Sequence, residues 1–377
     1  MNYYLRTIFG WLDFGVRRFI EYWTRRRSPA ITTMRTGAYF VLAALGGALC
    51  LNLVYADANV FLAIKFEAIG GVPEFLVFAA FWLGVFAFVV GLVWEIWRDV
   101  REGRANARKR VLVIEQRGLL RGTDSPLRDA VPEALIGHRR AIPVDLTPFV
   151  HDGRVTDPER ALAKTKLIRH DLETAADDAD RADVSIVYGG VAPVPMTFLA
   201  GFLIGDEGAI TIMDWMREPG RWRPLDGIDD GDRFKLDGLD DVPRGTADVA
   251  VAVEVSYKLD EPGFRLSTGN MPLVRIYLPQ GRPDCHWSEE KQQALVSDFL
   301  AAMVALEGRG VRRIHMTVAA PNSVVFRLGR AYDNRNLPEL LVYQYERSAM
   351  PPFPWSVRMP THGVPEAALV RTEPVAA

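Results

Sequence analysis

The sequence lacks most of the residue patterns on which common catalytic and metal-binding sites depend. Of its 377 residues only two are cysteines and six are histidines, and no two histidines have the close spacing of metal ligands. This excludes a disulfide scaffold and argues against a structural zinc site. A P-loop, a Gly-x-Gly-x-x-Gly loop after a strand, a Gly-x-Ser-x-Gly elbow and a His-Glu-x-x-His helix are also absent. We therefore expect no catalytic residues, no cofactor and no metal, and we favour a sensor over an enzyme.

Charged residues are missing from two long stretches near the N-terminus. Thr36–Ala56 runs for 21 residues and Phe75–Trp94 for 20 without one charged side chain. At about 1.5 Å per residue, each helix would cross the roughly 30 Å hydrocarbon core of a bilayer. We therefore expect two transmembrane helices. The alternative is a signal peptide cleaved after Ala58, but the basic region of about 35 residues before the apolar run is too long for it.

Basic residues set the orientation of these spans. Seven arginines precede the first span, six Lys/Arg lie in residues 98–110, and the connecting loop 57–74 has only Lys65. The positive-inside rule therefore predicts an inner-membrane protein with both termini in the bacterial cytoplasm. The aromatic and basic segment 1–35 either lies on the lipid surface or serves only as a topogenic tail.

Small residues recur at four-residue spacing in both spans, as at Ala43 and Gly47 or Ala80 and Gly84. Such pairs let helices approach closely, either within one chain or between chains. Neither span contains an ionisable residue, which disfavours a transporter because a transport path usually needs one in the membrane.

The remainder of the chain has a different character and is expected to form a separate unit. Residues 1–110 carry a net charge of +6 and residues 111–377 a net charge of −8. In the acidic part, short apolar runs typical of buried strands alternate with helical segments, which indicates a largely parallel α/β sheet. The expected strands are 111–115, 184–188, 209–215, 249–257, 273–278, 311–318 and 340–345, and the main expected helices are 158–182, 195–204, 288–308 and 322–331.

An internal repeat divides this unit into two similar halves. Four residues recur at an offset of 128, and with two residues inserted the strand 210–215 falls on 340–345. We therefore expect two pseudo-symmetric Rossmann-like halves. The four repeated pairs are Ala192/Ala320, Pro193/Pro321, Phe198/Phe326 and Gly201/Gly329. The expected division of the chain is an interfacial segment 1–35, a transmembrane region 36–97, a basic linker 98–110, a sensor domain 111–352 with halves of about 111–247 and 248–352, and a Pro-rich tail 353–377.

The loops after two equivalent strands are the candidate ligand site, because α/β sheets bind ligands at the carboxyl ends of their parallel strands. Loops 188–193 and 318–323 are rich in small residues, and each opens a helix whose N-terminus favours an anion such as phosphate. Each loop alone is equally explained as a tight turn with an N-cap. Two such loops in a pseudo-symmetric pair indicate a ligand with several phosphates.

Aromatic and basic residues at the strand ends extend this site. Trp215 and Tyr345 end equivalent strands and are candidates for base stacking or for core packing. The arginines that follow strand ends are candidates for phosphate contacts or for solvated surface positions. The candidate ligand-binding residues are Arg117, Tyr188, Gly189, Gly190, Pro193, Trp215, Arg217, Ala319, Pro321, Asn322, Ser323, Tyr345 and Arg347.

Two stretches resemble a known family of sensor domains. HMTVAAPNSVVFRLGRAYDNRNLPELLVYQYER (315–347) resembles the end of SAVED domains, and VSIVYGGVAPVPMTFLAGFLIGDEGAITIMDW (184–215) resembles their earlier half. The resemblance is distributed over roughly 65 residues, without a unique signature. It implies two fused CARF-like halves that sense a cyclic oligonucleotide, as in the CBASS antiphage systems. The two membrane spans in place of a nuclease resemble the transmembrane-SAVED effectors.

The resemblance also implies partners and a mechanism. A phage-activated synthase would supply a cyclic oligonucleotide, expected to be a tri- or tetranucleotide. Its binding would drive head-to-tail self-association, cluster the helices in the membrane lipid and disrupt the inner membrane. Two alternatives remain open: a membrane-tethered nucleotide-binding regulator that recruits a partner, and a ring nuclease that degrades the signal.

Overall fold

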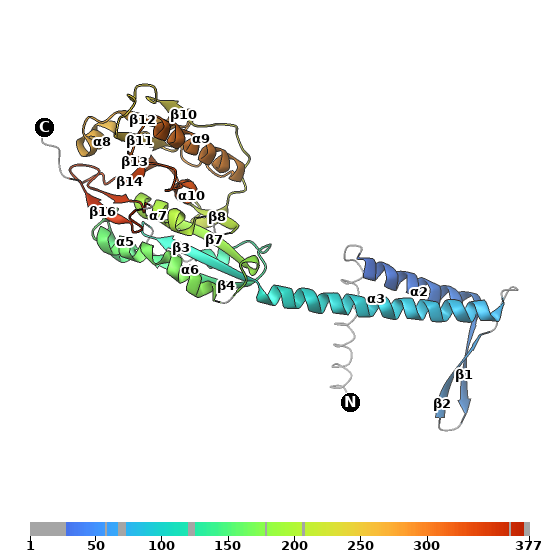
Figure 1. Cartoon of the computed structure of the whole chain (residues 1–377). Helices are drawn as coiled ribbons and strands as arrows, with labels where there is room; N and C mark the ends of the chain where they lie inside the picture. Colours follow the sequence, from blue (N-terminus) through green and yellow to red (C-terminus); the bar gives the residue numbers. More distant parts are fainter. Residues whose placement is uncertain are drawn as a thin grey trace. The chain divides into compact units, whose positions relative to one another are not determined.

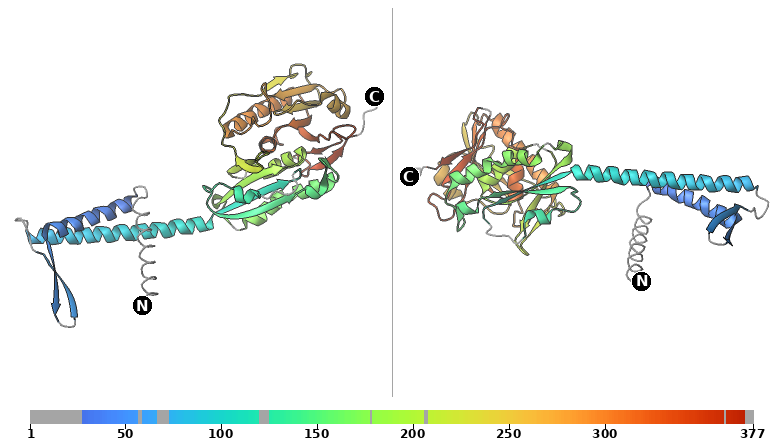
Figure 2. Two further views of the ribbon diagram at one scale, coloured as in Figure 1. Left: turned by 180° about the vertical axis from the view of Figure 1, so that it is seen from behind. Right: turned by 90° about the horizontal axis from the view of Figure 1, so that it is seen from below.

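The structure is a computed structural model that describes residues 28–56, 59–66, 73–119, 125–177, 179–205, 208–361 and 363–372. Most of the expected interfacial segment 1–35 lies outside these residues. The chain divides into two compact units, Met1–Asn106 and Ala107–Ala377. Each unit is drawn in Figure 1 and, from two further sides, in Figure 2.

The described residues of the first unit form two helices and a hairpin. Helix α2 (Pro29–Ala48) leads into strand β1 (Leu49–Ala56), which pairs antiparallel with β2 (Asn59–Phe66), and the long helix α3 (Glu74–Arg108) follows (Figure 1). Within the described part of the chain, α3 from Phe75 onward is the one helix both long and apolar enough to cross a membrane.

The expected first span therefore differs from the structure. Only residues up to Ala48 of Thr36–Ala56 are helical, and the remainder pairs with β2. Gly46 and Gly47 weaken the end of the helix, and the residues around Val54 and Tyr55 prefer a strand. The hairpin satisfies the backbone hydrogen bonds that a longer helix would otherwise make.

Glycines let α2 and α3 pack closely within the chain. A Cβ atom added at Gly37 would lie 2.5 Å from the backbone nitrogen of Phe88, and one at Gly84 would lie 2.8 Å from the carbonyl oxygen of Gly37. The start of α2 is fixed as well, because the Ser28 hydroxyl donates to the Glu95 carboxylate (3.1 Å), which is 2% exposed. The small residue at position 84 therefore allows two helices of the same chain to pack closely.

The first half of the second unit is a five-stranded sheet in the order β4-β3-β7-β8-β9. The first four strands are parallel and β9 is antiparallel. Its strands are β3 (Arg110–Arg117), β4 (His138–Asp145), β7 (Val184–Val191), β8 (Ile210–Met216) and β9 (Arg221–Pro224), with a small hairpin of β5 (Val150–His151) and β6 (Arg154–Val155). Its helices are α4 (Leu127–Ala130), α5 (Pro158–Lys166), α6 (Ile168–Ala176) and α7 (Val194–Ile204), with 3-10 turns η1 (Thr147–Phe149) and η2 (Arg181–Asp183).

The second half repeats this plan in a seven-stranded sheet of order β10-β12-β11-β13-β14-β15-β16. The four strands from β12 to β14 are parallel, and β10, β15 and β16 are antiparallel to their neighbours. The strands are β10 (Lys235–Asp237), β11 (Asp248–Glu254), β12 (Leu273–Tyr277), β13 (Arg313–Ala319), β14 (Glu339–Gln344), β15 (Trp355–Arg358) and β16 (Ala368–Arg371), and the helices are α8 (Glu261–Thr268), α9 (Glu289–Gly308) and α10 (Asn322–Ala331).

Three expected boundaries are corrected by the structure. The expected tail 353–377 instead supplies β15 and β16, because Trp355 and Val357 are buried against β14 and cover its edge. Residues 235–237 fall in the range expected for the first half, but they form β10, which pairs with β12 of the second half. The expected helix 158–182 is divided at Leu167 into α5 and α6 and ends at Ala176.

The two halves meet through α7 and α10, and the contact confirms the repeat. A Cβ atom at Gly201 would lie 2.0 Å from the Phe326 carbonyl oxygen, and one at Gly329 would lie 2.1 Å from the Phe198 carbonyl oxygen. The contact is therefore reciprocal, each glycine admitting the backbone of the other helix. Figure 1 shows α7 and α10 where the two halves meet.

Candidate functional site

A pocket of about 140 Å³ lies at the carboxyl ends of strands from both halves. Strands β7 and β8 reach it from the first half, and the residues after β11 and β13 reach it from the second. This is the edge at which parallel sheets bind ligands. The residues that line it are Gly190, Val191, Asp214, Trp215, Arg217, Ser256, Tyr257, Pro283, Asp284, His286, Ala320, Pro321 and Asn322.

Parallel pairing brings the two predicted loops to one edge in equivalent ways. After β3, the backbone N–H groups of Gly118 and Leu119 both donate to the Val191 carbonyl oxygen (2.9 Å). After β11, those of Val255 and Ser256 both donate to the Ala319 carbonyl oxygen (3.0 Å). Five predicted site residues line the pocket: Gly190, Trp215, Arg217, Pro321 and Asn322.

Tyr188 has a structural role instead of a place in the pocket. Its ring is fully buried and stacks on Phe326 of the other half, with ring centroids 3.6 Å apart. Its hydroxyl donates to the Gln116 side-chain oxygen (2.8 Å), and burial raises the pKa of the Tyr188 phenol far above its ordinary value. A sequence pattern cannot show which face Tyr188 takes, because β7 is buried on both faces and its apolar residues do not alternate with polar ones.

Other predicted residues serve the join between the halves. The Asn322 amide donates to the Ala192 carbonyl oxygen (3.1 Å) and the Thr197 hydroxyl (3.1 Å), so its donors bind the other half. Ser323 is buried, and its N–H donates to the Asp214 carboxylate (3.1 Å). Pro193, the residue before α7, is also buried.

The remaining predicted residues do not line the pocket. The Arg117 guanidinium pairs with Glu115 (2.7 Å), and this hydrogen bond raises the pKa of Arg117. Tyr345 is 44% exposed and packs against Phe353, with ring centroids 5.2 Å apart. Arg347 is exposed on the surface. Gly189 and Ala319 lie at the ends of β7 and β13 but are absent from the pocket wall.

Two buried polar residues of the pocket were missed from sequence. Asp214 accepts the N–H groups of Ser323 (3.1 Å) and Trp215 (2.7 Å) and is 5% exposed. His286 is 4% exposed, and its Nε2 lies 3.3 Å from the Asp214 carboxylate. In the part of the chain that the structure describes, neither ring nitrogen of His286 makes a hydrogen bond of good geometry. The pocket therefore contains a buried imidazole with unsatisfied polar atoms.

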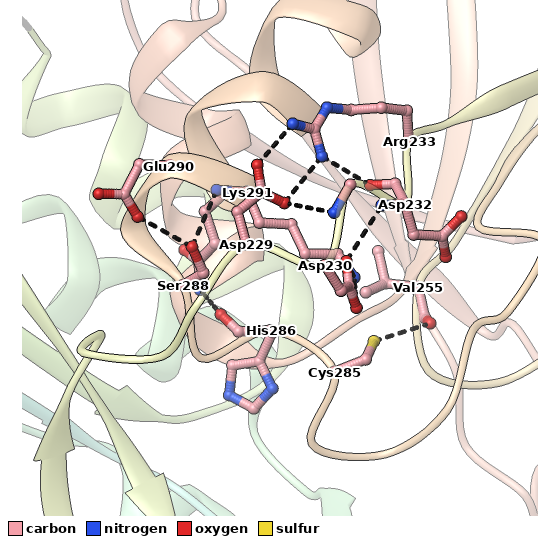
Figure 3. Close-up of polar contacts among 12 residues, drawn as sticks. Asp229, Asp230, Asp232, Arg233, Val255, Cys285, His286, Ser288, Glu290 and Lys291 are labelled. Atoms are coloured by element: carbon pink, nitrogen blue, oxygen red, sulfur yellow. Dashed lines mark hydrogen bonds and ion pairs between the residues drawn. The ribbon is translucent and has the colours of Figure 1, made fainter.

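The loop that carries His286 is held firmly by its neighbours. The His286 carbonyl oxygen accepts from Gln292 (2.8 Å), and the Cys285 thiol lies 3.7 Å from the Val255 carbonyl oxygen. Helix α9 begins directly after this loop, where the Ser288 hydroxyl accepts the Lys291 N–H (3.2 Å) as an N-cap. Figure 3 shows the His286 ring turned away from these polar contacts.

The linker between the halves is fixed to the same helix start (Figure 3). The Lys291 ammonium is almost fully buried and donates to both oxygens of Asp230 (2.8 Å each). The neighbouring Asp229 pairs with Arg233, and this hydrogen bond lowers the pKa of Asp229 to about 2. These contacts hold the linker and pair the carboxylates of Asp229 and Asp230.

Two further pocket residues are accessible. Tyr257 is 56% exposed, and Asp284 is exposed with a left-handed backbone (φ 65°), which is uncommon outside glycine. Trp215 lines the pocket from the opposite half, so two aromatic residues border it. Its charged groups are two carboxylates, Asp214 and Asp284, and one guanidinium, Arg217.

Two family models match the chain and together span most of it. Residues 9–162 match a model described as "SAVED-fused 2TM effector domain". Residues 168–359, half of the chain, match one described as "SMODS-associated and fused to various effectors sensor domain", abbreviated SAVED. A search of curated proteins found no relative.

Solved structures of SAVED/CARF receptors are also similar. The Acinetobacter baumannii Cap4 receptor with the cyclic trinucleotide 2'3'3'-cAAA has a TM-score of 0.43 and 10% identity, covering 76% of this chain and 58% of that one. The Moraxella osloensis Cap4 receptor also has a TM-score of 0.43 and 10% identity, covering 76% of this chain and 57% of that one. The chain thus spans less than two thirds of either receptor.

Proposed function

Because the chain belongs to the SAVED sensor family and carries a fused two-transmembrane effector domain, we propose that its α/β unit binds a cyclic oligonucleotide and thereby activates its membrane unit. In this proposal the protein is an effector of antiphage defence. It resides in the bacterial inner membrane with both termini in the cytoplasm, and a synthase supplies the ligand. Activation drives self-association and disrupts the membrane.

One observation carries the sensor part of this proposal. The pocket is built from equivalent loops of both halves, beside the α7–α10 contact, so its shape depends on how the halves sit against each other. A ligand that bridges the halves therefore has a direct way to bias their arrangement. Backbone groups of small residues and two aromatic faces suit a nucleotide, since base stacking on aromatics tolerates any base.

Trp215→Ala is expected to weaken binding of 3'3'3'-cAAA by about tenfold or more, because base–aromatic stacking contributes about 1–3 kcal/mol. The matched control is Tyr345→Ala, the pseudo-equivalent aromatic, which lies outside the pocket and should change affinity less than about twofold. Calorimetric titration of the full-length protein in detergent measures both. An equal loss of affinity in the two variants would contradict the assignment of this pocket as the ligand site.

Ligand binding is also expected to convert the full-length protein in detergent into larger multimers, because a head-to-tail contact does not close on itself unless its rotation completes a ring. Size-exclusion chromatography with light scattering, with and without a panel of cyclic di-, tri- and tetranucleotides, measures this. Binding without a change in mass would instead support a tethered regulator that recruits another protein.

A second candidate function is favoured by the Asp214–His286 pair. A carboxylate 3.3 Å from an imidazole is an arrangement found in general bases, and a base beside the ligand could take the proton of a ribose 2'-hydroxyl. The activated 2'-oxygen would attack the adjacent phosphorus and expel the 5'-oxygen, which takes up a proton and opens the ring. Thin-layer chromatography of the ligand after long incubation decides between stable binding and turnover.

A further inference from the structure

The size of the pocket limits how much of a cyclic oligonucleotide can enter it. Its volume of about 140 Å³ is well below the roughly 300–1,000 Å³ of sites that enclose drug-sized ligands. A cyclic trinucleotide is larger than such ligands, so only a part of it fits. Trp215 and Tyr257 present aromatic faces at this pocket, which suits a single base better than a sugar or a phosphate.

The charged side chains of the pocket indicate which part of the cyclic oligonucleotide enters it. Two of its charged side chains, Asp214 and Asp284, are carboxylates, which repel phosphate and act only as hydrogen-bond acceptors. The group that enters must therefore bring hydrogen-bond donors. Arg217 is exposed at the turn after β8, where it can meet a phosphate that stays outside.

His286 independently points to a ligand. It lines the pocket, is 4% exposed, and has no well-formed hydrogen bond from either ring nitrogen to any residue that the structure describes. Buried polar atoms are normally paired, and among the described residues this imidazole has only the Asp214 carboxylate, 3.3 Å from Nε2, as a polar neighbour, so a ligand can supply a further partner. As an imidazolium it donates from both ring nitrogens, so Nε2–H can face the Asp214 carboxylate while Nδ1–H contacts the ring nitrogen beside an amino group.

We propose that the pocket takes one base of the ligand and selects a base with an exocyclic amino group, which Asp284 and the Asp214–His286 pair recognise by its edge. This inference rests on the proposed function and deepens it. The amino N–H groups of adenine or cytosine donate to a carboxylate, while the adjacent ring nitrogen accepts from His286. Hypoxanthine and uracil have a carbonyl oxygen in the position of the amino group. That oxygen would face a carboxylate, and two acceptors repel each other, so these bases should bind more weakly.

The test compares two ligands that differ at this position. Full-length protein in detergent is titrated with 3'3'3'-cAAA and with its inosine counterpart, in which an oxygen replaces each amino group. The wild type is expected to bind the inosine compound about 10- to 100-fold more weakly. In the Asp284→Asn variant, the ratio of the two dissociation constants is expected to fall by about tenfold. The carboxamide that replaces the carboxylate can donate a hydrogen bond to the oxygen of the inosine base.

Asp152→Asn is the matched control. Asp152 is also an aspartate with a left-handed backbone (φ 50°), but it lies in the β5–β6 turn outside the pocket, so its variant should keep the wild-type ratio. Equal wild-type affinity for the two compounds, or the same ratio in Asp284→Asn as in wild type, overturns this inference and leaves the proposed function standing. Failure of both compounds, and of every member of the panel of cyclic di-, tri- and tetranucleotides, to bind overturns the proposed function and this inference with it.

Discussion

Alanine at Gly201 or at Gly329 is expected to lower the free energy of unfolding by about 2 kcal/mol or more, and the double variant is expected to leave the α/β unit close to unfolding. In an open helix the same change would stabilise by up to about 1 kcal/mol. Here each added methyl would lie within about 2.1 Å of a backbone carbonyl oxygen of the other helix. A backbone atom cannot turn aside, so the two helices must separate and lose contacts.

Denaturant unfolding of the detergent-solubilised protein measures this effect, which is large against the 5–15 kcal/mol that stabilises an ordinary domain. Gly308→Ala is the control, since Gly308 ends α9 and no atom among the described residues lies within 4 Å of its added Cβ. That variant should match the wild type or exceed it slightly. Wild-type stability of Gly329→Ala would show that the halves do not meet in this way.

Leucine at Gly84 is expected to abolish ligand-dependent leakage of vesicles, reducing it by tenfold or more to the background rate. A Cβ atom at this position already lies 2.8 Å from the Gly37 carbonyl oxygen and 2.9 Å from the Val41 nitrogen, so a leucine forces α2 away from α3. The readout is release of a trapped dye from phosphatidylethanolamine–phosphatidylglycerol vesicles that contain the full-length protein, after addition of whichever member of the cyclic di-, tri- and tetranucleotide panel binds it.

Gly103→Leu is the control within the same helix, because none of the described atoms lies within 4 Å of its added Cβ. It should leak like the wild type. Binding of the ligand should be unchanged in both variants, since both substitutions lie in the first unit. Wild-type leakage from the Gly84→Leu protein would mean that effector action does not depend on the packing of α2 on α3.

The sequence was most informative where the repeat constrained it. The shared offset of 128 placed Phe198 opposite Phe326 in register, and their helices do pack reciprocally. The loops after β7 and β13 could be expected to meet, because parallel strands share one carboxyl edge. These predictions succeed because they depend on the internal repeat and on the pattern of apolar runs, both of which can be read from the sequence.

The missed residues depend on contacts that local sequence does not carry. His286 lies in a loop with no motif, and it reaches Asp214 across 72 positions of chain. The hairpin of β1 and β2 was missed for a different reason. An uncharged run fits a membrane helix and a strand alike, and pairing with residues 59–66 decides between them.

The reciprocal glycine contact has a consequence for the origin of the fold. A surface in which Gly201 receives Phe326 while Gly329 receives Phe198 has the geometry of a two-fold interface between identical subunits. A single ancestral half would have paired with its own copy through this surface before duplication joined the two genes. The two halves of a fused chain can diverge separately, and His286 lines the pocket from the second half. In this way an asymmetric pocket could arise between two halves that are related by a pseudo-two-fold axis.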